Sequence, residues 1–271
     1  MSLRGCRTIL VLLVALALGC YRFPSAEERA ASFQSLASTR VNNVPIQDFV
    51  EKRTAHLINV DSLQTSTDRE GHVYLKSIRI TGAATAVAIA HDGYLLTAAH
   101  CASTPVVAVL PARENEPNFA RARIVYLGKA RTLDQDIAII KVDRQLPEIF
   151  EFASDLEVRA NTPVLIAGHD MVGRRIGFTF AAGHILPLIE PSDFLAPHLT
   201  PVLHTTPLKP GDSGGPLLTP AGKLVAINIA TATLRDRNDE RTGISLRPNP
   251  LWIQSLLQAD RKQHATLASK N

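Results

Sequence analysis

The stretch Ala-Thr-Ala-Val-Ala-Ile-Ala-His-Asp-Gly-Tyr-Leu-Leu-Thr, residues 84–97, has the pattern of two short strands joined by a tight turn. Ala84–Ala90 and Tyr94–Thr97 are rich in apolar residues, and His91-Asp92-Gly93 between them is typical of a turn. We therefore predict a β-hairpin at this position.

The same pattern of short apolar runs and turn residues continues from His72 onward. The first group of expected strands is Val73–Ile80, Ala84–Ala90, Tyr94–Thr97, Val106–Leu110, Arg123–Leu127 and Ile137–Val142. A polar connection separates it from a second group: Pro163–Ala167, Arg175–Ile185, Pro201–Thr205, Pro216–Thr219, Lys223–Thr231 and Gly243–Leu246. About six strands in each half, with no long helix between them, predict an all-β fold of two antiparallel six-stranded barrels.

The end of the chain has a different pattern. Asn249-Pro250 is a favourable N-cap and first-turn pair, and Ile253, Leu256 and Leu257 follow at helical spacing. We predict one C-terminal helix after the strands. The barrels and this helix would form a domain over residues 72–262, followed by a tail at 263–271.

The run Gly211-Asp212-Ser213-Gly214-Gly215-Pro216 carries the strongest chemical signal. Glycines on both sides of Ser213 let the backbone turn sharply and let a substrate approach closely. In such a loop the N–H groups of Gly211 and Ser213 can converge on one point and stabilise an oxyanion. A plain glycine-rich hairpin turn is the alternative, but a turn has no need of this six-residue string.

A serine hydroxyl needs a base to take its proton and a group that orients the base. His100 in Leu96-Thr97-Ala98-Ala99-His100-Cys101 follows small residues at a strand end, which favours a position facing a cleft. In Asp134-Gln135-Asp136-Ile137-Ala138-Ile139-Ile140, Asp136 directly adjoins a buried apolar run and is preferred over Asp134 as the orienting carboxylate. We interpret the neighbouring Cys101 as a small buried hydrophobe rather than a catalytic thiol.

These three motifs resemble the signatures of the chymotrypsin-like (trypsin-like) serine peptidases, in that family's His, Asp, Ser order. The resemblance covers about residues 75 to 260. It implies a catalytic triad between two barrels, with His100 as general base and then acid, Asp136 as its orienting group and Ser213 as the nucleophile. No metal or other cofactor is implied, and the chain contains no His-Glu-x-x-His motif or clustered Cys/His spacing.

Within the family, the chain is more similar to bacterial peptidases of the HtrA/Deg kind than to animal digestive enzymes. It lacks an Ile-Val-Gly-Gly-type activation start, and the cysteine that usually pairs with the one after the histidine is absent. Leu224-Val225-Ala226-Ile227-Asn228 and Gly243-Ile244-Ser245-Leu246 resemble the HtrA sequence beyond the nucleophile. About two dozen residues follow Leu246, so we expect no PDZ domain.

Three positions bear on substrate specificity through the same resemblance. Pro207 stands where trypsin-type enzymes keep an acidic residue for Lys or Arg, and Asn228 stands where glutamyl endopeptidases keep a histidine. Leu208, Asn228 and Thr231 would line the specificity pocket. Small or medium apolar side chains are the expected substrates, rather than Lys, Arg or Glu.

The first residues have the pattern of an export signal. Arg4 and Arg7 precede the apolar run Ile9–Leu18, which is short for a membrane span but suits a secretory leader at 1–19. Ala17-Leu18-Gly19-Cys20 resembles a bacterial lipobox, which implies lipidation of Cys20 and anchoring in the cell envelope. Ordinary leader cleavage that leaves Cys20 unmodified is the alternative.

Residues 20–71 would then be a lipidated N-terminus and spacer, with a short amphipathic helix within Pro45–Ile58. The formal net charge is +4, of which Arg4 and Arg7 supply two, and this small, scattered charge gives no reason to expect nucleic acid as a partner. We expect an exported serine endopeptidase that acts on proteins or peptides. A catalytically idle binding module on the same fold is the alternative.

Overall fold

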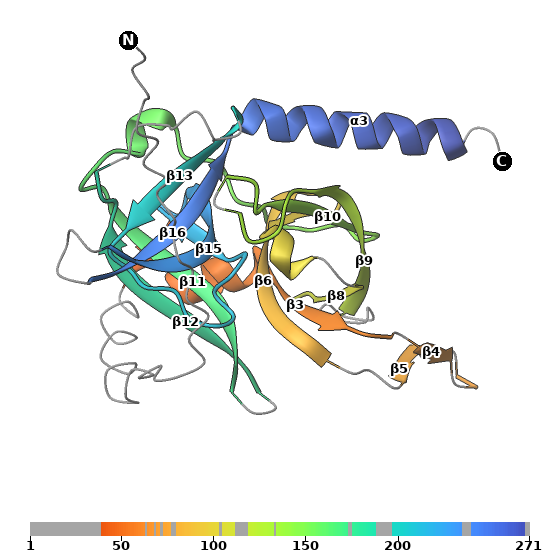
Figure 1. Cartoon of the computed structure of the whole chain (residues 1–271). Coiled ribbons are helices and arrows are strands. Elements are labelled where there is room, and N and C mark those ends of the chain that lie inside the picture. The colour runs from red at the N-terminus through yellow and green to blue at the C-terminus, as the bar shows by residue number, and fades with distance from the viewer. Residues whose placement is uncertain are drawn as a thin grey trace, which may run out of the picture.

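The computed structural model describes residues 39–268, with gaps at 63, 68, 71–72, 77–79, 103–104, 112–118, 133, 173–174, 188–196 and 235–239. Two β-rich halves lie side by side, and a long helix follows the second half (Figure 1). The leader expected at 1–19, Cys20 and the first part of the expected spacer lie outside the described residues. Across the described ranges, no helix is both long and apolar enough to span a membrane.

The first half is a closed barrel with the strand order β10-β7-β6-β3-β8-β9. Its strands are β3 (Thr54–Val60), β6 (Ile80–Ala90), β7 (Tyr94–Thr97), β8 (Val106–Val109), β9 (Phe119–Leu127) and β10 (Ala138–Val142). The predicted hairpin is confirmed, because β6 and β7 pair in antiparallel fashion around the turn at His91–Gly93. Gly93 has φ +99°, and a Cβ there would lie 2.2 Å from the carbonyl oxygen of Val142.

The expected spacer needs a correction, because its second part belongs to the barrel. The predicted helix is shorter than expected: α2 covers Ile46–Glu51, although it buries Ile46, Phe49 and Val50 as predicted. Residues 54–60 form strand β3, which pairs with both β6 and β8. The apolar residues of this segment fit a strand buried inside a barrel better than one face of a helix.

Four short strands lie outside the two large sheets. β1 (Arg40–Val41) pairs with β2 (Val44–Pro45), and β4 (Gln64–Thr67) pairs with β5 (Val73–Lys76). The second pair projects from the first barrel (Figure 1). The expected first-barrel strand Val73–Ile80 is therefore wrong, because Val73–Lys76 pairs with β4 outside the barrel and Ile80 begins β6.

The second half is a six-stranded antiparallel sheet with the order β12-β11-β14-β15-β16-β13. Its strands are β11 (Pro163–Val172), β12 (Arg175–His184), β13 (Leu199–His204), β14 (Pro216–Leu218), β15 (Leu224–Leu234) and β16 (Glu240–Pro248). The expected second closed barrel is therefore a sheet, whose edge strands are joined, among the described residues, at the Ile185–His204 bridge. At this bridge Leu186 donates its N–H to Leu203 O at 2.8 Å, and Thr205 donates its N–H to His184 O at 3.1 Å.

The main hydrophobic core is continuous between the halves. It includes Val87 and Leu96 of the first barrel together with Leu165 and Ala167 of the second sheet. Apolar burial of this kind is the dominant favourable term in folding. The junction between β6 and β11 is therefore packed, and it provides a rigid base for groups at its edge.

The predicted C-terminal helix is confirmed as α3 (Pro250–Ala268). Its N-cap is Asn249, whose Oδ1 accepts hydrogen bonds from the backbone N–H of Leu251 at 2.9 Å and of Trp252 at 3.4 Å. Ile253 and Leu257 are buried, as their spacing predicted.

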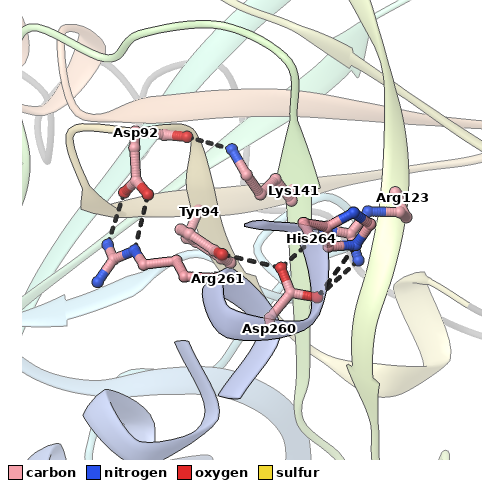
Figure 2. A network of polar contacts seen from close by, with 7 residues as sticks. All are labelled: Asp92, Tyr94, Arg123, Lys141, Asp260, Arg261 and His264. Carbon is pink, nitrogen blue, oxygen red and sulfur yellow. Dashed lines mark hydrogen bonds and ion pairs between the residues drawn. The ribbon is translucent and has the colours of Figure 1, made fainter. Parts of the chain in front are cut away.

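A polar network fixes α3 to the first barrel (Figure 2). Asp260 of α3 accepts two hydrogen bonds from Arg123 of β9, at 2.8 and 2.7 Å, and a third from the hydroxyl of Tyr94 at 2.8 Å. The next residue, Arg261, donates two hydrogen bonds to Asp92 in the β6–β7 turn. The last element of the chain thus joins the second half to the first.

Candidate active site

Strand pairing in the first barrel brings His100 and Asp136 to the same end of the sheet. β7 and β10 are antiparallel neighbours, with Thr97 opposite Ala138. His100 lies three residues after Thr97, in a short 3₁₀ turn (Ala99–Cys101), and Asp136 lies two residues before Ala138. In an antiparallel pair, the end of one strand lies beside the start of the other. This register therefore places the residues just after β7 and just before β10 close together.

The two residues make two contacts. Asp136 Oδ1 accepts the backbone N–H of His100 at 2.9 Å, and Asp136 Oδ2 lies 2.7 Å from His100 Nδ1. Asp136 is 3% exposed, whereas the His100 side chain is 23% exposed. The carboxylate is therefore held away from solvent, and the imidazole is held with one side accessible.

This pairing changes the acidity of the imidazole. Burial opposes the charged form and lowers the pKa of His100, but the hydrogen bonds to Asp136 and to Cys101, and the charge interactions with both, act in the other direction. The net result is a raised pKa for His100. A proton taken up by the His100 imidazole would thus be stabilised by the adjacent carboxylate of Asp136.

The loop with Ser213 has the sharp backbone that its glycines predicted. Gly211 and Gly214 have φ values of +97° and +77°, which favour glycine. A Cβ on Gly214 would lie 2.1 Å from the carbonyl oxygen of Thr85 and 2.1 Å from Thr97 Oγ1. The loop therefore packs directly against the first barrel, close to the strand that leads to His100.

Within the described ranges, the backbone N–H groups of Gly211 and Ser213 donate to no other group of the chain. Their neighbours do: the N–H of Asp212 binds Lys209 O at 3.0 Å, and that of Gly214 binds Asn228 O at 2.8 Å. Ser213 is partly exposed. Two unoccupied donors beside an accessible hydroxyl are what an oxyanion site requires.

No hydrogen bond joins the His100 imidazole to the Ser213 hydroxyl among the described contacts. Such bonds are often long in unliganded sites and tighten when substrate binds. The backbone brings the two motifs together instead, because the N–H of Thr85 donates to the carbonyl of Ser213 at 2.9 Å.

Sequence reasoning missed the groups that hold Asp212. This residue is 1% exposed, and its carboxylate accepts the hydroxyl of Thr179 and, at 2.8 Å, the backbone N–H of Lys209. Gly168 leaves the necessary space, since a Cβ there would lie 2.5 Å from Asp212 Oδ1. A threonine in a strand carries no distinctive signal, so the sequence offered no means of finding Thr179.

The three expected pocket residues lie close to the loop. The hydroxyl of Thr231 accepts the backbone N–H of Leu208 at 2.8 Å, and Asn228 donates its own N–H to Gly215 O at 2.9 Å. Asn228 is fully buried, and its Oδ1 accepts the hydroxyl of Ser245 at 2.9 Å. Its amide is thus engaged within the protein, and Leu208 is buried at 6% exposure.

The two described surface cavities lie elsewhere. One adjoins Arg53 and Leu146 in the first half, and the other adjoins His198 and Arg247 in the second. Since neither is lined by His100 or Ser213, we assign the site from its chemistry.

Cys101 is buried and forms no disulfide, as expected for a small core residue, and its side chain hydrogen-bonds with His100. His169 and His204 are also buried, and burial lowers their pKa values to about 3 and about 4, with a smaller effect of His56 on His169. Among the described residues, no group of three or more His, Cys, Asp or Glu side chains is placed to hold a metal ion.

The fold and this arrangement define a protein class. Residues 84–227 match the family model of the trypsin-like peptidase domain, which is more than half of the chain. The chain therefore belongs to the trypsin-like peptidase family. Among curated proteins, no sequence matches it.

Solved structures of HtrA-type proteases share the fold. The HtrA-type protease AlgW with a decapeptide matches with TM-score 0.54 and 20% identity, over 78% of this chain and 66% of AlgW. AlgW with a tripeptide matches with TM-score 0.52 and 20% identity, over 78% of this chain and 61% of that one. The Rv3671c protease from M. tuberculosis, in its active form, matches with TM-score 0.52 and 20% identity, over 75% of this chain and 79% of that one. The chain thus spans less than two thirds of the AlgW chains.

Proposed function

We propose that this protein is a serine endopeptidase that hydrolyses peptide bonds through His100, Asp136 and Ser213. The observation that carries the proposal is the His100 ring held by buried Asp136, beside a serine loop with two unoccupied N–H donors. Membership of the trypsin-like peptidase family supports the same assignment.

In the proposed reaction, His100 Nε2 takes the hydroxyl proton of Ser213 while Ser213 Oγ attacks the scissile carbonyl carbon. His100 Nδ1 keeps its proton and donates it in a hydrogen bond to Asp136, whose charge stabilises the imidazolium that forms. The carbonyl oxygen becomes an oxyanion, to which Gly211 and Ser213 donate their N–H groups. His100 then gives its proton to the leaving amine, and water hydrolyses the acyl-enzyme by the same steps.

The direct test combines a fluorophosphonate probe with a peptide-library assay, on a form of the chain that begins after the expected leader and Cys20. Wild type should label at Ser213 and cleave peptides, and Ser213→Ala should lose label and about 10⁴- to 10⁶-fold in rate. Near-wild-type cleavage by Ser213→Ala would refute the proposal. A folded wild type that neither labels nor cleaves would instead favour an idle binding module.

We further propose that Leu208, Asn228 and Thr231 select small or medium apolar side chains at the cleaved position. The burial of Leu208 and the neutral amide of Asn228 support this, since neither offers a charge to a Lys, Arg or Glu substrate. The tripeptide and decapeptide in the AlgW structures support peptides as the substrate class. Library cleavage after Lys, Arg or Glu in preference to Ala or Val would contradict this specificity.

Export and lipid anchoring at Cys20 are the remaining part of the proposal, supported by the leader pattern and the lipobox resemblance. In a bacterial host, the full chain should incorporate labelled palmitate and partition with membranes. Cys20→Ala should abolish the label. A secreted product without lipid, cleaved before an unmodified Cys20, would contradict the anchoring.

A further inference from the structure

Thr85 lies in β6 of the first barrel and is fully buried at the junction with the second half. Its backbone N–H donates to Ser213 O at 2.9 Å, and its side-chain hydroxyl donates to Gly211 O at 2.8 Å. One residue of the first barrel therefore holds the backbone carbonyls on both sides of Asp212-Ser213.

The hydroxyl of Thr85 uses all of its hydrogen-bonding positions. A hydroxyl offers one proton and two lone pairs. The proton goes to Gly211 O, one lone pair accepts the backbone N–H of His169 at 2.7 Å, and the other faces His169 Nδ1 at 3.3 Å. This assigns the ring proton of neutral His169 to Nδ1. Thr85 is also fixed from the other side, because Thr97 Oγ1 donates to Thr85 O at 2.7 Å.

These contacts control the direction of an oxyanion donor. Gly211 has no side chain and φ +97°, so little within the loop itself restricts the peptide that follows it. Gly211 O and Ser213 O belong to the peptide groups before and after the one that carries the Ser213 N–H. Holding both oxygens therefore restricts the orientation of that N–H. Misplacement of a catalytic group by about 1 Å can cost on the order of 10²-fold in rate.

We propose that Thr85 is a positioning residue for the nucleophile loop, acting through Gly211 and Ser213 without touching substrate. This inference rests on the proposed function. A β-branched threonine suits the role, because its restricted χ1 keeps the hydroxyl aimed at Gly211 O.

The test compares Thr85→Val, which keeps the shape and removes the hydroxyl, with Thr85→Ser, which keeps the hydroxyl. Thr54→Val is the matched control: Thr54 is buried in the same barrel and its hydroxyl also donates to one backbone carbonyl, Val50 O at 3.0 Å. The rate at which the fluorophosphonate probe phosphonylates Ser213, kcat and KM are measured at a temperature where circular dichroism shows every variant to be folded.

Thr85→Val should lower kcat and the phosphonylation rate by about 10- to 100-fold with KM nearly unchanged, since the loop loses its fixed geometry. Thr85→Ser should stay within about threefold of wild type because the hydroxyl remains. Thr54→Val should lose thermal stability without loss of kcat. Equal kcat in Thr85→Val and Thr54→Val would overturn the inference.

If Thr85→Val does not fold, Thr85→Ala takes its place, because the smaller side chain leaves room for water. The same fall in the phosphonylation rate is expected, and a phosphonylation rate equal to wild type would overturn the inference. The proposed function fails separately: in that case wild type itself does not react at Ser213, whatever the residue at position 85.

Discussion

Asp136 binds His100 at both its backbone and its ring: one carboxylate oxygen accepts the His100 N–H at 2.9 Å, and the other lies 2.7 Å from Nδ1. The backbone contact fixes where the residue lies, and the ring contact fixes how the imidazole is turned. Because Asp136 is almost completely buried, both contacts are shielded from water.

Asp136→Asn should therefore lower kcat by about 10⁴-fold, because an amide no longer stabilises the imidazolium. It should also lower the pKa of His100, which Asp136 raises against the effect of burial. A raised folded-state pKa gives stability that is complete below the unfolded pKa and is lost as pH rises through the folded pKa. NMR titration of His100 in Ser213→Ala, with and without Asp136→Asn, measures the shift.

Asp134→Asn, in the same loop, is the matched control and should leave both the rate and the His100 titration near those of the parent. An unchanged His100 pKa in Asp136→Asn would contradict the assignment.

Gly214→Ala should destabilise the protein by about 3 kcal/mol or more, since positive φ and a clash with backbone both oppose the new methyl group. The nearest obstacles to that methyl are Thr85 O and Thr97 Oγ1, both at 2.1 Å. Gly82→Ala is the comparison, because its nearest obstacle is a side-chain atom, Asn59 Nδ2, at 3.3 Å. Urea unfolding of both variants checks the difference. Equal stabilities would show that the loop can move to accommodate the new methyl group.

His204 should make the fold sensitive to acid. Its imidazole is fully buried, with Nε2 lying 3.0 Å from Ser245 Oγ, and burial lowers its pKa to about 4. As pH falls below about 6.5, the unfolded chain takes up the proton first, so stability is complete above that pH and declines toward pH 4. From pH 7 to pH 5 the loss from His204 is about 2 kcal/mol.

Urea unfolding at pH 7 and pH 5 tests this effect, and His204→Gln should reduce the pH dependence by that amount. Thr54→Val lowers stability without removing a titratable group, so its pH dependence should match wild type. A pH dependence that His204→Gln leaves unchanged would assign the effect to other groups.

Asp260 should contribute more to the attachment of α3 than Asp92. Asp260 is 8% exposed and accepts hydrogen bonds from Arg123 and Tyr94, and these bonds to Arg123 are the main cause of its lowered pKa. We expect Asp260→Asn to lower the free energy of unfolding by about 1–3 kcal/mol at pH 7. The loss is limited to this range because solvent screens the partly exposed Arg123. This contribution is present above the unfolded pKa of the carboxyl and is lost as pH falls through the folded pKa.

Asp92→Asn removes an ion pair with Arg261 that is open to solvent, with side chains 35% and 46% exposed. It should cost about 0.5 kcal/mol or less. Figure 2 shows the contacts of both aspartates, and urea unfolding compares the two variants. An equal loss of unfolding free energy in both variants would mean that the burial of Asp260 adds nothing to the attachment of α3.

Local patterns in the sequence were sufficient for most of the strands, for the terminal helix and for the pairing of His100 with Asp136. They failed at residues 54–60, where a helical interpretation lost to the strand β3. A short apolar segment fits either structure, and only the neighbouring strands β6 and β8 decide which backbone hydrogen bonds it can make.

By itself, the sequence determined the residues with distinctive chemistry: the serine between glycines, the histidine after small residues and the aspartate before an apolar strand. Only the tertiary structure decided what holds the serine loop, because Thr85 lies 128 residues before Ser213 in the sequence. Thr179, which binds Asp212, is likewise an ordinary threonine in a strand. A threonine hydroxyl is satisfied by any partner in reach, so its role is set by which backbone carbonyl the packed halves bring next to it.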